Sequence, residues 1–469
     1  MHWSRDAGRP PARNPMKLHA FVHDKPVATL DSPDGFRHVL TYHPNIDAES
    51  FVSLLMPVRT ESYAYPELHP LFRMNLPEGF LLSILQEQLG PEIGASPLNL
   101  LSIVGRHSIG RVKLAVPGAD PAQPPVAFEL ASLLKGDNSE EVFVELVRRY
   151  ARSGVSGVVP KFLTPATFDK FGKGTVATDR YIVKGTTSRL PGVALNEHLC
   201  MEVARKAGIS CADTQVSEDG QALAVQRFDY ELDGVTRKGM EDLCSLLALR
   251  PEQKYDATWE EVATRIKQIV TVPAQQNAAL SQLTDLILLS YALRNSDCHT
   301  KNLALLYSSR NDVMLSPVYD MLTITAYADY SRNSPGLLLG GRKTWRPGKS
   351  LEIFLQTSCN LRPTEVKNRV ERICESMIKV APQVVEAAAS YPQFREIGKH
   401  MLLLWNEGMS SLRLQKIWIL PTLHEQIESS KFGSQEDEAG KNRPLAPSWK
   451  PLSATSFSQA PAPATARRC

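Results

Sequence analysis

Short stretches in which apolar and polar residues alternate dominate the first part of the chain. The segment MKLHAFVHDKPVATL, which begins at Met16, predicts one strand, a turn at residues 24–26 and a second strand. Similar alternation in FRHVLTY and FVSLLMPVR, residues 36–42 and 51–59, predicts further strands. The apolar spacing of residues 77–90, which end in glycine, is instead that of a helix. A small α+β unit is therefore expected at this end of the chain.

The composition of residues 118–127, GADPAQPPVA, is that of a linker, so this first unit should span residues 16–117. Helical and strand-like stretches alternate after the linker. The expected elements are a helix over 140–151, a strand over 180–185, a helix over 195–208 that stops at Gly208, and a strand over 222–230.

Helical periodicity dominates the later part of the chain, from about residue 259 to 295 and again over 363–381 and 382–391. Strands that come first and helices that come later argue for two lobes. We expect a first lobe over residues 128–250 and a mainly helical second lobe over 251–432. The predicted fold class is α+β, with a small β-rich subdomain ahead of the two lobes.

The composition is that of a globular protein. The chain has 469 residues, of which 43% are hydrophobic and 22% charged, which is enough to bury two or three cores. Residues 1–15 and the Pro-, Ala- and Ser-rich tail 433–469 should be disordered, and Met16 is an alternative start. We find no internal repeat.

Charge and cysteine usage narrow the class of protein further. The net charge is only +3, so nothing demands nucleic acid as a direct partner. The seven cysteines occur singly, without a CxxC pair, which suits a reducing cytoplasm. No apolar run approaches the ~20 residues that a membrane span needs. We therefore expect a soluble cytoplasmic protein without a membrane segment.

Two acids and an amide stand in an apolar neighbourhood between residues 290 and 321. The predicted helix LTDLILLSYALRN ends just before Asp297, and Asn302 follows at i+5. A hairpin formed by LALLY and VMLSPVYD should then bring Asp320 to the same end of the sheet as Asn302. Asn302 and Asp320 would supply hard oxygen ligands for Mg²⁺, and Asp297 would stay free to orient or deprotonate a hydroxyl. Each residue alone is also explained as a turn former or hairpin cap, but the three together favour a site.

The neighbouring residues leave alternatives open. His299 either bonds a backbone carbonyl and holds the loop or forms part of the site. Cys298 beside it could suggest a zinc site, but no second Cys/His pair stands at the spacing of zinc ligands.

A site for phosphoryl transfer also needs cations and a backbone cradle for the phosphates. Lys184, in the predicted strand RYIVKG, is a candidate to bind phosphate, with an exposed edge lysine as the alternative. Glu197 could anchor that lysine or be a solvated residue at a helix start. The segment SGVSGVVPK, which contains Ser156, Gly157 and Lys161, could fold over phosphates through its amide groups, although it is neither a Walker A motif nor GxGxxG.

With these residues in place, the chain resembles the HipA family of type II toxin–antitoxin Ser/Thr protein kinases over nearly its whole folded length. The N-terminal segments MKLHAFVHDKPVATL, PLFRMNLPEG and LLSIVGRHSIGRVKL look like the N-terminal subdomain of that family. The segments SGVVPK, YIVKG, NEHLCMEVARKAGI, AVQRFDY, MEDLCSLL, KYD, NSDCHTKNLALL and LSPVYDM follow in the family's order. The resemblance implies a two-lobed α+β fold like that of protein kinases, with ATP in the cleft.

The resemblance also implies roles for individual residues. Asp297 would be the catalytic aspartate, Asn302 and Asp320 the Mg²⁺ ligands, and Lys184 the lysine that binds the nucleotide. The remaining ATP-binding positions that it implies are Ser156, Gly157, Lys161, His299 and the adenine-contacting linker Glu241, Asp242 and Leu243, whose backbone would contact the base.

The chain departs from the family pattern in two places. The phosphate loop of the family often carries a serine that is autophosphorylated, and the outer serine position is Gly154 here. Ser156 is therefore the first candidate for autophosphorylation and Ser153 the second. The Gly-rich continuation that usually follows KY is DATWEEV in this chain, which leaves open how residues 256–260 contact nucleotide or substrate.

The resemblance implies an ATP-dependent Ser/Thr protein kinase that acts as a growth-arrest toxin. Its partner would be a HipB-like helix-turn-helix antitoxin, which would make the DNA contacts, and its target a protein such as an aminoacyl-tRNA synthetase. One alternative is a small-molecule phosphotransferase, against which the PLFRMNLPEG unit argues. Another is a catalytically silent nucleotide-binding regulator, against which the intact Lys184, Asp297, Asn302 and Asp320 argue.

Overall fold

The computed structural model of the chain describes residues 16–35, 37–76, 96–121, 130–139, 141, 174–177 and 180–413. Several predictions fall outside these ranges. They concern the disorder of residues 1–15 and 433–469, the helices over 77–90 and 140–151, most of the linker 118–127, and the phosphate-loop residues Ser153, Ser156, Gly157 and Lys161.

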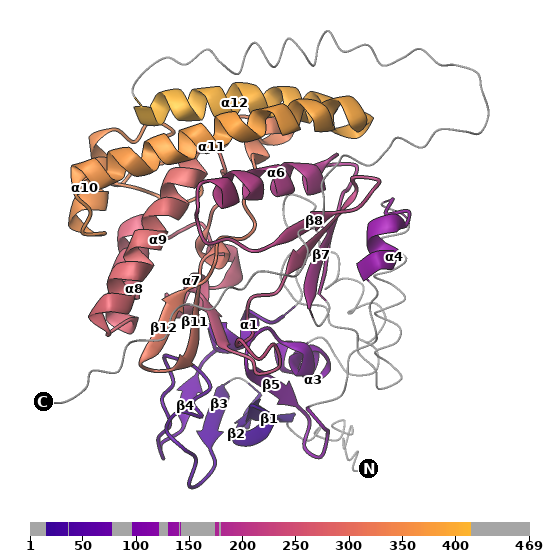
Figure 1. Cartoon of the computed structure of the whole chain (residues 1–469). Helices are drawn as coiled ribbons and strands as arrows, with labels where there is room; N and C mark the ends of the chain where they lie inside the picture. Colours follow the sequence, from indigo (N-terminus) through magenta and orange to yellow (C-terminus); the bar gives the residue numbers. More distant parts are fainter. Residues whose placement is uncertain are drawn as a thin grey trace, which may run out of the picture. The chain divides into compact units, whose positions relative to one another are not determined.

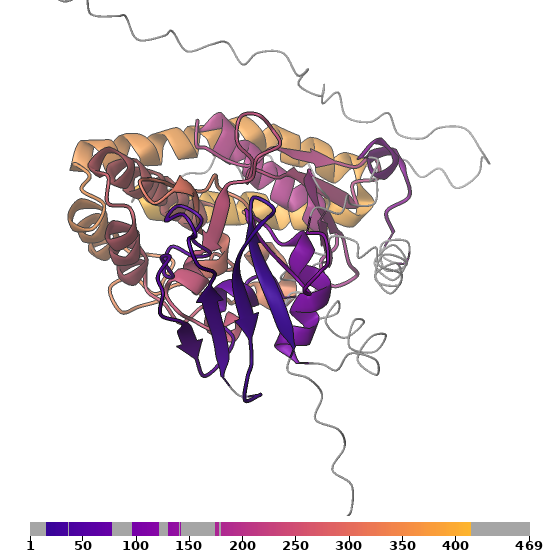
Figure 2. The ribbon, with the colours of Figure 1, turned by 90° about the horizontal axis from the view of Figure 1, so that it is seen from below.

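A five-stranded antiparallel sheet follows Met16, in the order β4-β3-β2-β1-β5. Its strands are β1 (Lys17–Val22), β2 (Lys25–Asp31), β3 (His38–Tyr42), β4 (Tyr63–Tyr65) and β5 (Val112–Ala115). Helices α1 (Pro70–Arg73) and α3 (Pro97–Val104) add apolar side chains to the core of this sheet. The sheet is drawn in indigo and purple in Figure 1 and lies toward the viewer in Figure 2.

Two predictions for this region were wrong in detail. The turn between β1 and β2 lies at His23 and Asp24, which adopt positive φ angles of 49° and 62°, so that Lys25 and Pro26 already belong to β2. Residues 51–59 form no strand, although Phe51, Val52 and Met56 are fully buried.

Side chains satisfy the backbone of residues 51–59 where a neighbouring strand would otherwise do so. The Val52 amide donates to the Tyr42 hydroxyl at 2.8 Å, and that hydroxyl donates to the Met56 carbonyl at 2.6 Å. The alternation of apolar residues in this segment therefore reports burial in an irregular loop.

A four-stranded sheet in the order β6-β7-β9-β8 follows in the chain. Its strands are β6 (Gly174–Ala177), β7 (Tyr181–Gly185), β8 (Thr214–Val216) and β9 (Ala222–Gln226). Helix α6 (Val193–Lys206) follows β7 and contacts both this sheet and helix α11. Gly208, just beyond the helix, has a φ of 66°, the left-handed conformation that the predicted helix stop requires.

The third sheet is three-stranded, in the order β10-β11-β12, with strands β10 (Gly239–Asp242), β11 (Ala304–Ser309) and β12 (Asp312–Leu315). Helix α4 (Leu130–Lys135) precedes the four-stranded sheet in the chain, and α7 (Leu243–Leu246) follows β10 directly. The predicted hairpin between residues 304 and 315 is therefore confirmed, with its two strands antiparallel.

Long helices make up the C-terminal part of the described chain: α8 (Trp259–Ile269), α9 (Pro273–Ala292), α10 (Lys349–Thr357), α11 (Pro363–Ser390) and α12 (Arg395–Arg413). Helices α11 and α12 run side by side over α6 (Figure 1). The helical character predicted for residues 363–381 and 382–391 is confirmed, and α11 runs through both stretches and through Pro382 without a break. None of the described helices is long and apolar enough to cross a lipid bilayer.

Glu241 of β10 joins the N-terminal sheet region to the rest of the chain. Its fully buried carboxylate accepts hydrogen bonds from Ser53 Oγ, the Leu54 amide and the Tyr307 hydroxyl, each at 2.7 Å. Phe51 stacks on Tyr307, with their ring centroids 5.4 Å apart. Burial raises the pKa of the Glu241 carboxyl above its ordinary value, and the hydrogen bonds offset only part of that rise.

This raised pKa predicts a pH-dependent stability that Glu241→Gln should remove. Between the pKa of the unfolded chain and the higher pKa of the folded chain, the folded state binds more protons, so the free energy of unfolding falls as pH rises. The variant should also lose about 1–3 kcal/mol, because an amide cannot accept all three hydrogen bonds. Urea unfolding from pH 4 upward measures both effects, with exposed Glu252→Gln as the control. Equal pH slopes in the wild type and Glu241→Gln would contradict the prediction.

Candidate active site

The loop that follows α9 carries the predicted catalytic residues. Helix α9 is buried along most of its second half, and Arg294, with a φ of 57°, turns the chain away from the helix axis. The Asp297 amide then donates to Asn295 Oδ1 at 3.0 Å, which fixes the start of the loop. Asp297 itself is completely buried.

The i+5 spacing brings Asp297 and Asn302 into direct contact. Asn302 lies in the short 3-10 helix η4 (Thr300–Asn302), and its Nδ2 donates to the Asp297 carbonyl at 2.8 Å. The Asp297 carboxylate faces two other groups, accepting a hydrogen bond from the Tyr255 hydroxyl at 2.5 Å and lying 3.7 Å from His299 Nε2. Because the amide nitrogen of Asn302 is engaged, its oxygen is the atom able to bind a cation.

His299 and Cys298 lie in the same loop. The His299 ring packs edge-on against Tyr255, with the centroids 4.8 Å apart, and its carbonyl accepts a hydrogen bond from the Asn302 amide at 2.9 Å. His299 therefore helps to hold the loop, while its contact with ATP stays a prediction. Burial raises the pKa of Cys298 to about 12, so the thiol stays protonated and does not favour zinc.

Three charged side chains from three different elements meet beside this loop. Lys184 of β7 donates to both carboxylate oxygens of Glu197, at 2.7 and 2.9 Å, and to Asp320 Oδ1 at 2.6 Å. β7 lies between β6 and β9, so Lys184 is not on an edge strand. Glu197 is only 2% exposed, which rules out a solvated glutamate at the helix start. The lysine is thus held by two carboxylates, one from α6 and one from the segment after β12.

Asp320 adopts a backbone conformation that costs energy. Its φ is 55°, in the left-handed region that residues with a Cβ seldom occupy. Such strain persists where the surrounding structure requires it, often at functional sites. The segment before it is tied down by Val318, whose amide donates to the Ser210 carbonyl at 2.8 Å. The conformation therefore presents the Asp320 carboxylate to Lys184.

A second segment packs directly on the loop that carries Asp297. A Cβ atom added to Gly336 would lie 2.2 Å from the Cys298 carbonyl oxygen, a distance that no side chain can adopt without displacing backbone. Only glycine therefore lets residues 335–337 lie against residues 296–298. No local pattern in the sequence indicates this contact.

Several groups of the predicted adenine linker already make hydrogen bonds within the protein. Glu241 binds the N-terminal sheet region, as described above, and Asp242 Oδ1 accepts from the Ser245 amide at 2.6 Å as the N-cap of α7. The Asp242 amide donates to Met74 Sδ at 3.3 Å, and the Leu243 amide donates to the Leu303 carbonyl at 2.8 Å. Contacts of this linker with a base stay a prediction, and they would have to use groups other than these two amides.

The site residues offer oxygen ligands rather than a soft metal site. Within the residues that the structure describes, no group of three or more His, Cys, Asp or Glu side chains is arranged to hold a metal. The Asp320 carboxylate and the Asn302 amide oxygen are hard donors, the type that Mg²⁺ takes together with phosphate and water. The donor set therefore fits Mg²⁺.

Tyr255, in the KYD segment, was not among the predicted site residues. No local pattern connects this tyrosine to Asp297, which lies 42 residues further along the chain. Only the folded structure shows their contact.

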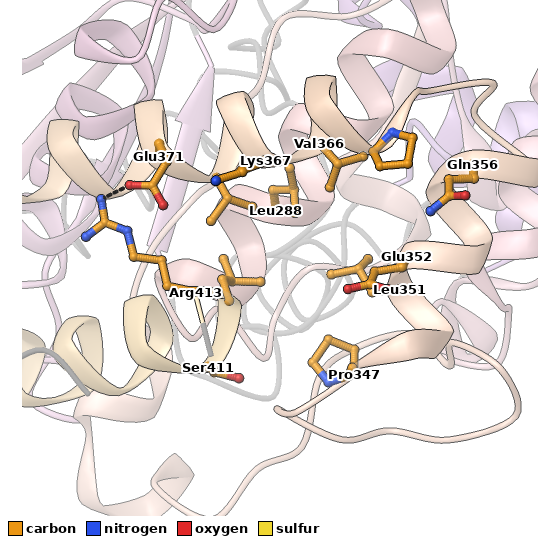
Figure 3. A pocket seen from close by; sticks show the side chains of 14 residues that line it. Leu288, Pro347, Leu351, Glu352, Gln356, Val366, Lys367, Glu371, Ser411 and Arg413 are labelled. Carbon is orange, nitrogen blue, oxygen red and sulfur yellow. Dashed lines mark ion pairs between the residues drawn. The ribbon is translucent and has the colours of Figure 1, made fainter. Parts of the chain in front are cut away.

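A separate cavity of about 390 Å³ lies among the C-terminal helices, away from these residues. Figure 3 shows it between α9, α10, α11 and the end of α12, with the Glu371–Arg413 ion pair at one side. Apolar residues such as Leu288 and Leu351 line it together with charged residues such as Glu352 and Lys367, and none of the predicted site residues lines it.

Comparisons with known proteins give a consistent result. The family model described as HipA N-terminal domain matches residues 18–115, and the one described as HipA-like C-terminal domain matches residues 153–382. Two curated relatives from Sinorhizobium fredii are named putative kinases. Y4dM is 26% identical over 342 residues, which cover 66% of this chain and 78% of the relative, and Y4mE is 27% identical over 303 residues, which cover 60% and 70%.

Among solved structures, the HipA chain in a Shewanella oneidensis MR-1 complex with HipB and operator DNA is similar to this chain, with a TM-score of 0.56. The two are 16% identical, and the match covers 87% of this chain and 99% of that one. At this identity the likeness shows the fold. The α+β fold with a β-rich N-terminal region and a mainly helical C-terminal part is therefore confirmed.

Proposed function

The chain belongs to the HipA family, and from this membership and the site geometry we propose that it is an ATP-dependent Ser/Thr protein kinase that acts as the toxin of a toxin–antitoxin system. The observation that carries the proposal is the cluster in which Lys184 contacts both Glu197 and Asp320. A lysine held by two carboxylates is poised to exchange one of them for phosphate.

Each side chain of the site has a separate task in this proposal. Lys184 neutralises phosphate charge while Glu197 keeps its side chain in place. Asp320 and Asn302 would hold Mg²⁺, which neutralises charge on the triphosphate when bound. Asp297 orients the acceptor hydroxyl and receives its proton.

The low-dielectric surroundings strengthen these interactions. Asp297 is fully buried, and the side chains of Lys184 and Asp320 are only 14% and 19% exposed. Charges in such surroundings interact more strongly than in water. A site with these charges already in place spends little free energy on reorganisation when phosphate binds.

The proposal extends to partners. The similar structure from Shewanella oneidensis is a complex with HipB and operator DNA. We therefore propose a HipB-like helix-turn-helix antitoxin as a partner of this chain, with DNA bound only through it, and the net charge of +3 agrees with indirect binding. A translation component such as an aminoacyl-tRNA synthetase is the proposed target, and autophosphorylation at Ser156 or Ser153 would limit the activity.

Radiolabelled ATP tests the proposed reaction. The purified chain is incubated with Mg²⁺ and [γ-³²P]ATP in a dialysed cell extract and, separately, with a pool of small metabolites. We expect label on protein, on serine or threonine after acid hydrolysis, and none when EDTA is added. Label that appears on small molecules alone would contradict the proposal and favour a small-molecule phosphotransferase. Binding of ATP without any transfer would favour a silent regulator.

A further inference from the structure

The hydroxyl of Tyr255 contacts the carboxylate that, in the proposed function, binds the acceptor hydroxyl. We propose that Tyr255 is a positioning residue that fills the acceptor's place on Asp297 in the resting enzyme and keeps water from that carboxylate until a protein hydroxyl displaces it. This inference rests on the proposed kinase function. It concerns how the kinase site admits a protein hydroxyl as the acceptor.

The contact is short and enclosed. The Tyr255 hydroxyl donates to Asp297 Oδ1 at 2.5 Å, and the side chain of Asp297 is 1% exposed. Tyr255 itself is half-buried. Its phenol therefore covers one oxygen of the Asp297 carboxylate.

Several contacts hold the backbone around Tyr255 in place. Lys343 Nζ donates to the Tyr255 carbonyl at 3.0 Å, and the Lys254 carbonyl accepts from Thr300 Oγ1 at 2.9 Å. The Thr300 bond ties this segment to the catalytic loop itself. The ring packs edge-on against His299, with an interplanar angle of 77°. Displacing the phenol thus requires a side-chain rotation but leaves the segment anchored.

The chemistry of the phenol suits a placeholder. In this contact the Tyr255 hydroxyl is the donor and the Asp297 carboxylate is the acceptor. The acceptor serine or threonine makes the same O–H to carboxylate hydrogen bond before its proton is transferred. The phenol and the acceptor therefore compete for one oxygen, and water competes too once the phenol is gone.

This competition predicts opposite kinetic effects from those of a residue that only orients Asp297. In Tyr255→Phe the ring stays against His299 and the competing hydroxyl is lost. A hydrogen bond to a charged group corresponds to about a tenfold or larger change in an equilibrium constant. The KM for an acceptor protein should therefore fall about tenfold, and ATP hydrolysis without acceptor should rise by a similar factor, while kcat changes less than about threefold.

The experiment compares the wild type, Tyr255→Phe and the control Tyr63→Phe. Tyr63 also loses a phenol hydrogen bond, to the Pro57 carbonyl at 2.7 Å, but it lies in the N-terminal sheet. Casein serves as the acceptor probe, and phosphate release from Mg²⁺-ATP in its absence measures hydrolysis. Lower KM and faster hydrolysis in Tyr255→Phe alone support the proposal. A fall in kcat with KM and hydrolysis unchanged overturns it, because Tyr255 would then only orient the carboxylate.

A second measurement does not depend on catalysis. With 3-fluorotyrosine in place of Tyr255, the ¹⁹F resonance should shift when Asp297→Asn removes the charge that accepts the hydrogen bond. The same label in place of Tyr63 should not respond. An unchanged resonance at position 255 overturns the proposed contact. A shifted resonance in a protein that transfers no phosphate would support the contact while refuting the kinase function.

Discussion

Asp297→Asn should reduce phosphoryl transfer by about 10²–10⁴-fold, because general-base assistance contributes a factor of that size. The substitution keeps the shape of the side chain, and the amide oxygen can still accept a hydrogen bond from Tyr255. It removes the negative charge that orients the acceptor hydroxyl and receives its proton. Asparagine is preferred because alanine would leave the Tyr255 hydroxyl without its acceptor and could disturb folding as well.

Transfer of label from [γ-³²P]ATP to protein measures this loss, and thermal unfolding checks that the variant is folded. ATP binding should persist, since Lys184 and Asp320 are unchanged. Asp329→Asn, which alters an exposed aspartate in the short 3-10 helix η6 (Ala328–Tyr330), provides the matched control and should behave as the wild type. In cells, the Asp297 variant should no longer arrest growth. Undiminished labelling in a folded variant would refute the catalytic role of Asp297.

Lys184→Met should impair both folding and nucleotide use. Removing the ammonium leaves Glu197 and Asp320 facing each other without a cation between them, and Glu197 is 2% exposed. Breaking a buried charge pair by removing one partner typically costs about 3–5 kcal/mol, because the remaining charge is buried and unpaired. The partial exposure of Asp320 places the loss toward the lower end of that range. Transfer to protein should fall to background, because the phosphates lose a positive charge.

A double variant separates the two effects of Lys184→Met. Adding Asp320→Asn removes one of the two facing carboxylates, so the free energy of unfolding should recover in part, whereas phosphoryl transfer should not. Urea unfolding measures the first quantity and labelled ATP the second. Lys379→Met, an exposed lysine on α11, serves as the control and should cost little stability. If Lys184→Met were as stable as that control, the three charges would not form the coupled cluster that we describe.

The sequence predicted the elements best where periodicity was long or glycine marked an end. The helices at 259–269 and 273–292, the strand at 181–185 and the helix that stops before Gly208 agree with the pattern. The loop at residues 51–59 was misread because its apolar residues are buried while its backbone pairs with the Tyr42 side chain at Val52 and Met56 and forms no strand. Helical periodicity was predicted on both sides of Pro382, and α11 runs through this proline because its packing outweighs the missing hydrogen bond.

Local pattern also located part of the site. Asp297 and Asn302 are five residues apart, so one loop conformation brings them into contact. The linker residues Glu241 and Asp242 show the limit of such reasoning. Their backbone was expected to contact a base, whereas their side chains hold the N-terminal sheet region and cap α7, which no local spacing reveals.

The amino-acid sequence alone therefore determined the helices and strands with clear periodicity and the pairing of Asp297 with Asn302, because these depend on neighbours a few residues away. The tertiary structure decided which distant side chains meet. Lys184 and Asp320 are 136 residues apart, and Ser53 and Glu241 are 188 apart. Such contacts follow from how the three sheets and the C-terminal helices pack. This packing depends on the shapes of all buried side chains together, and no short stretch of sequence contains that information.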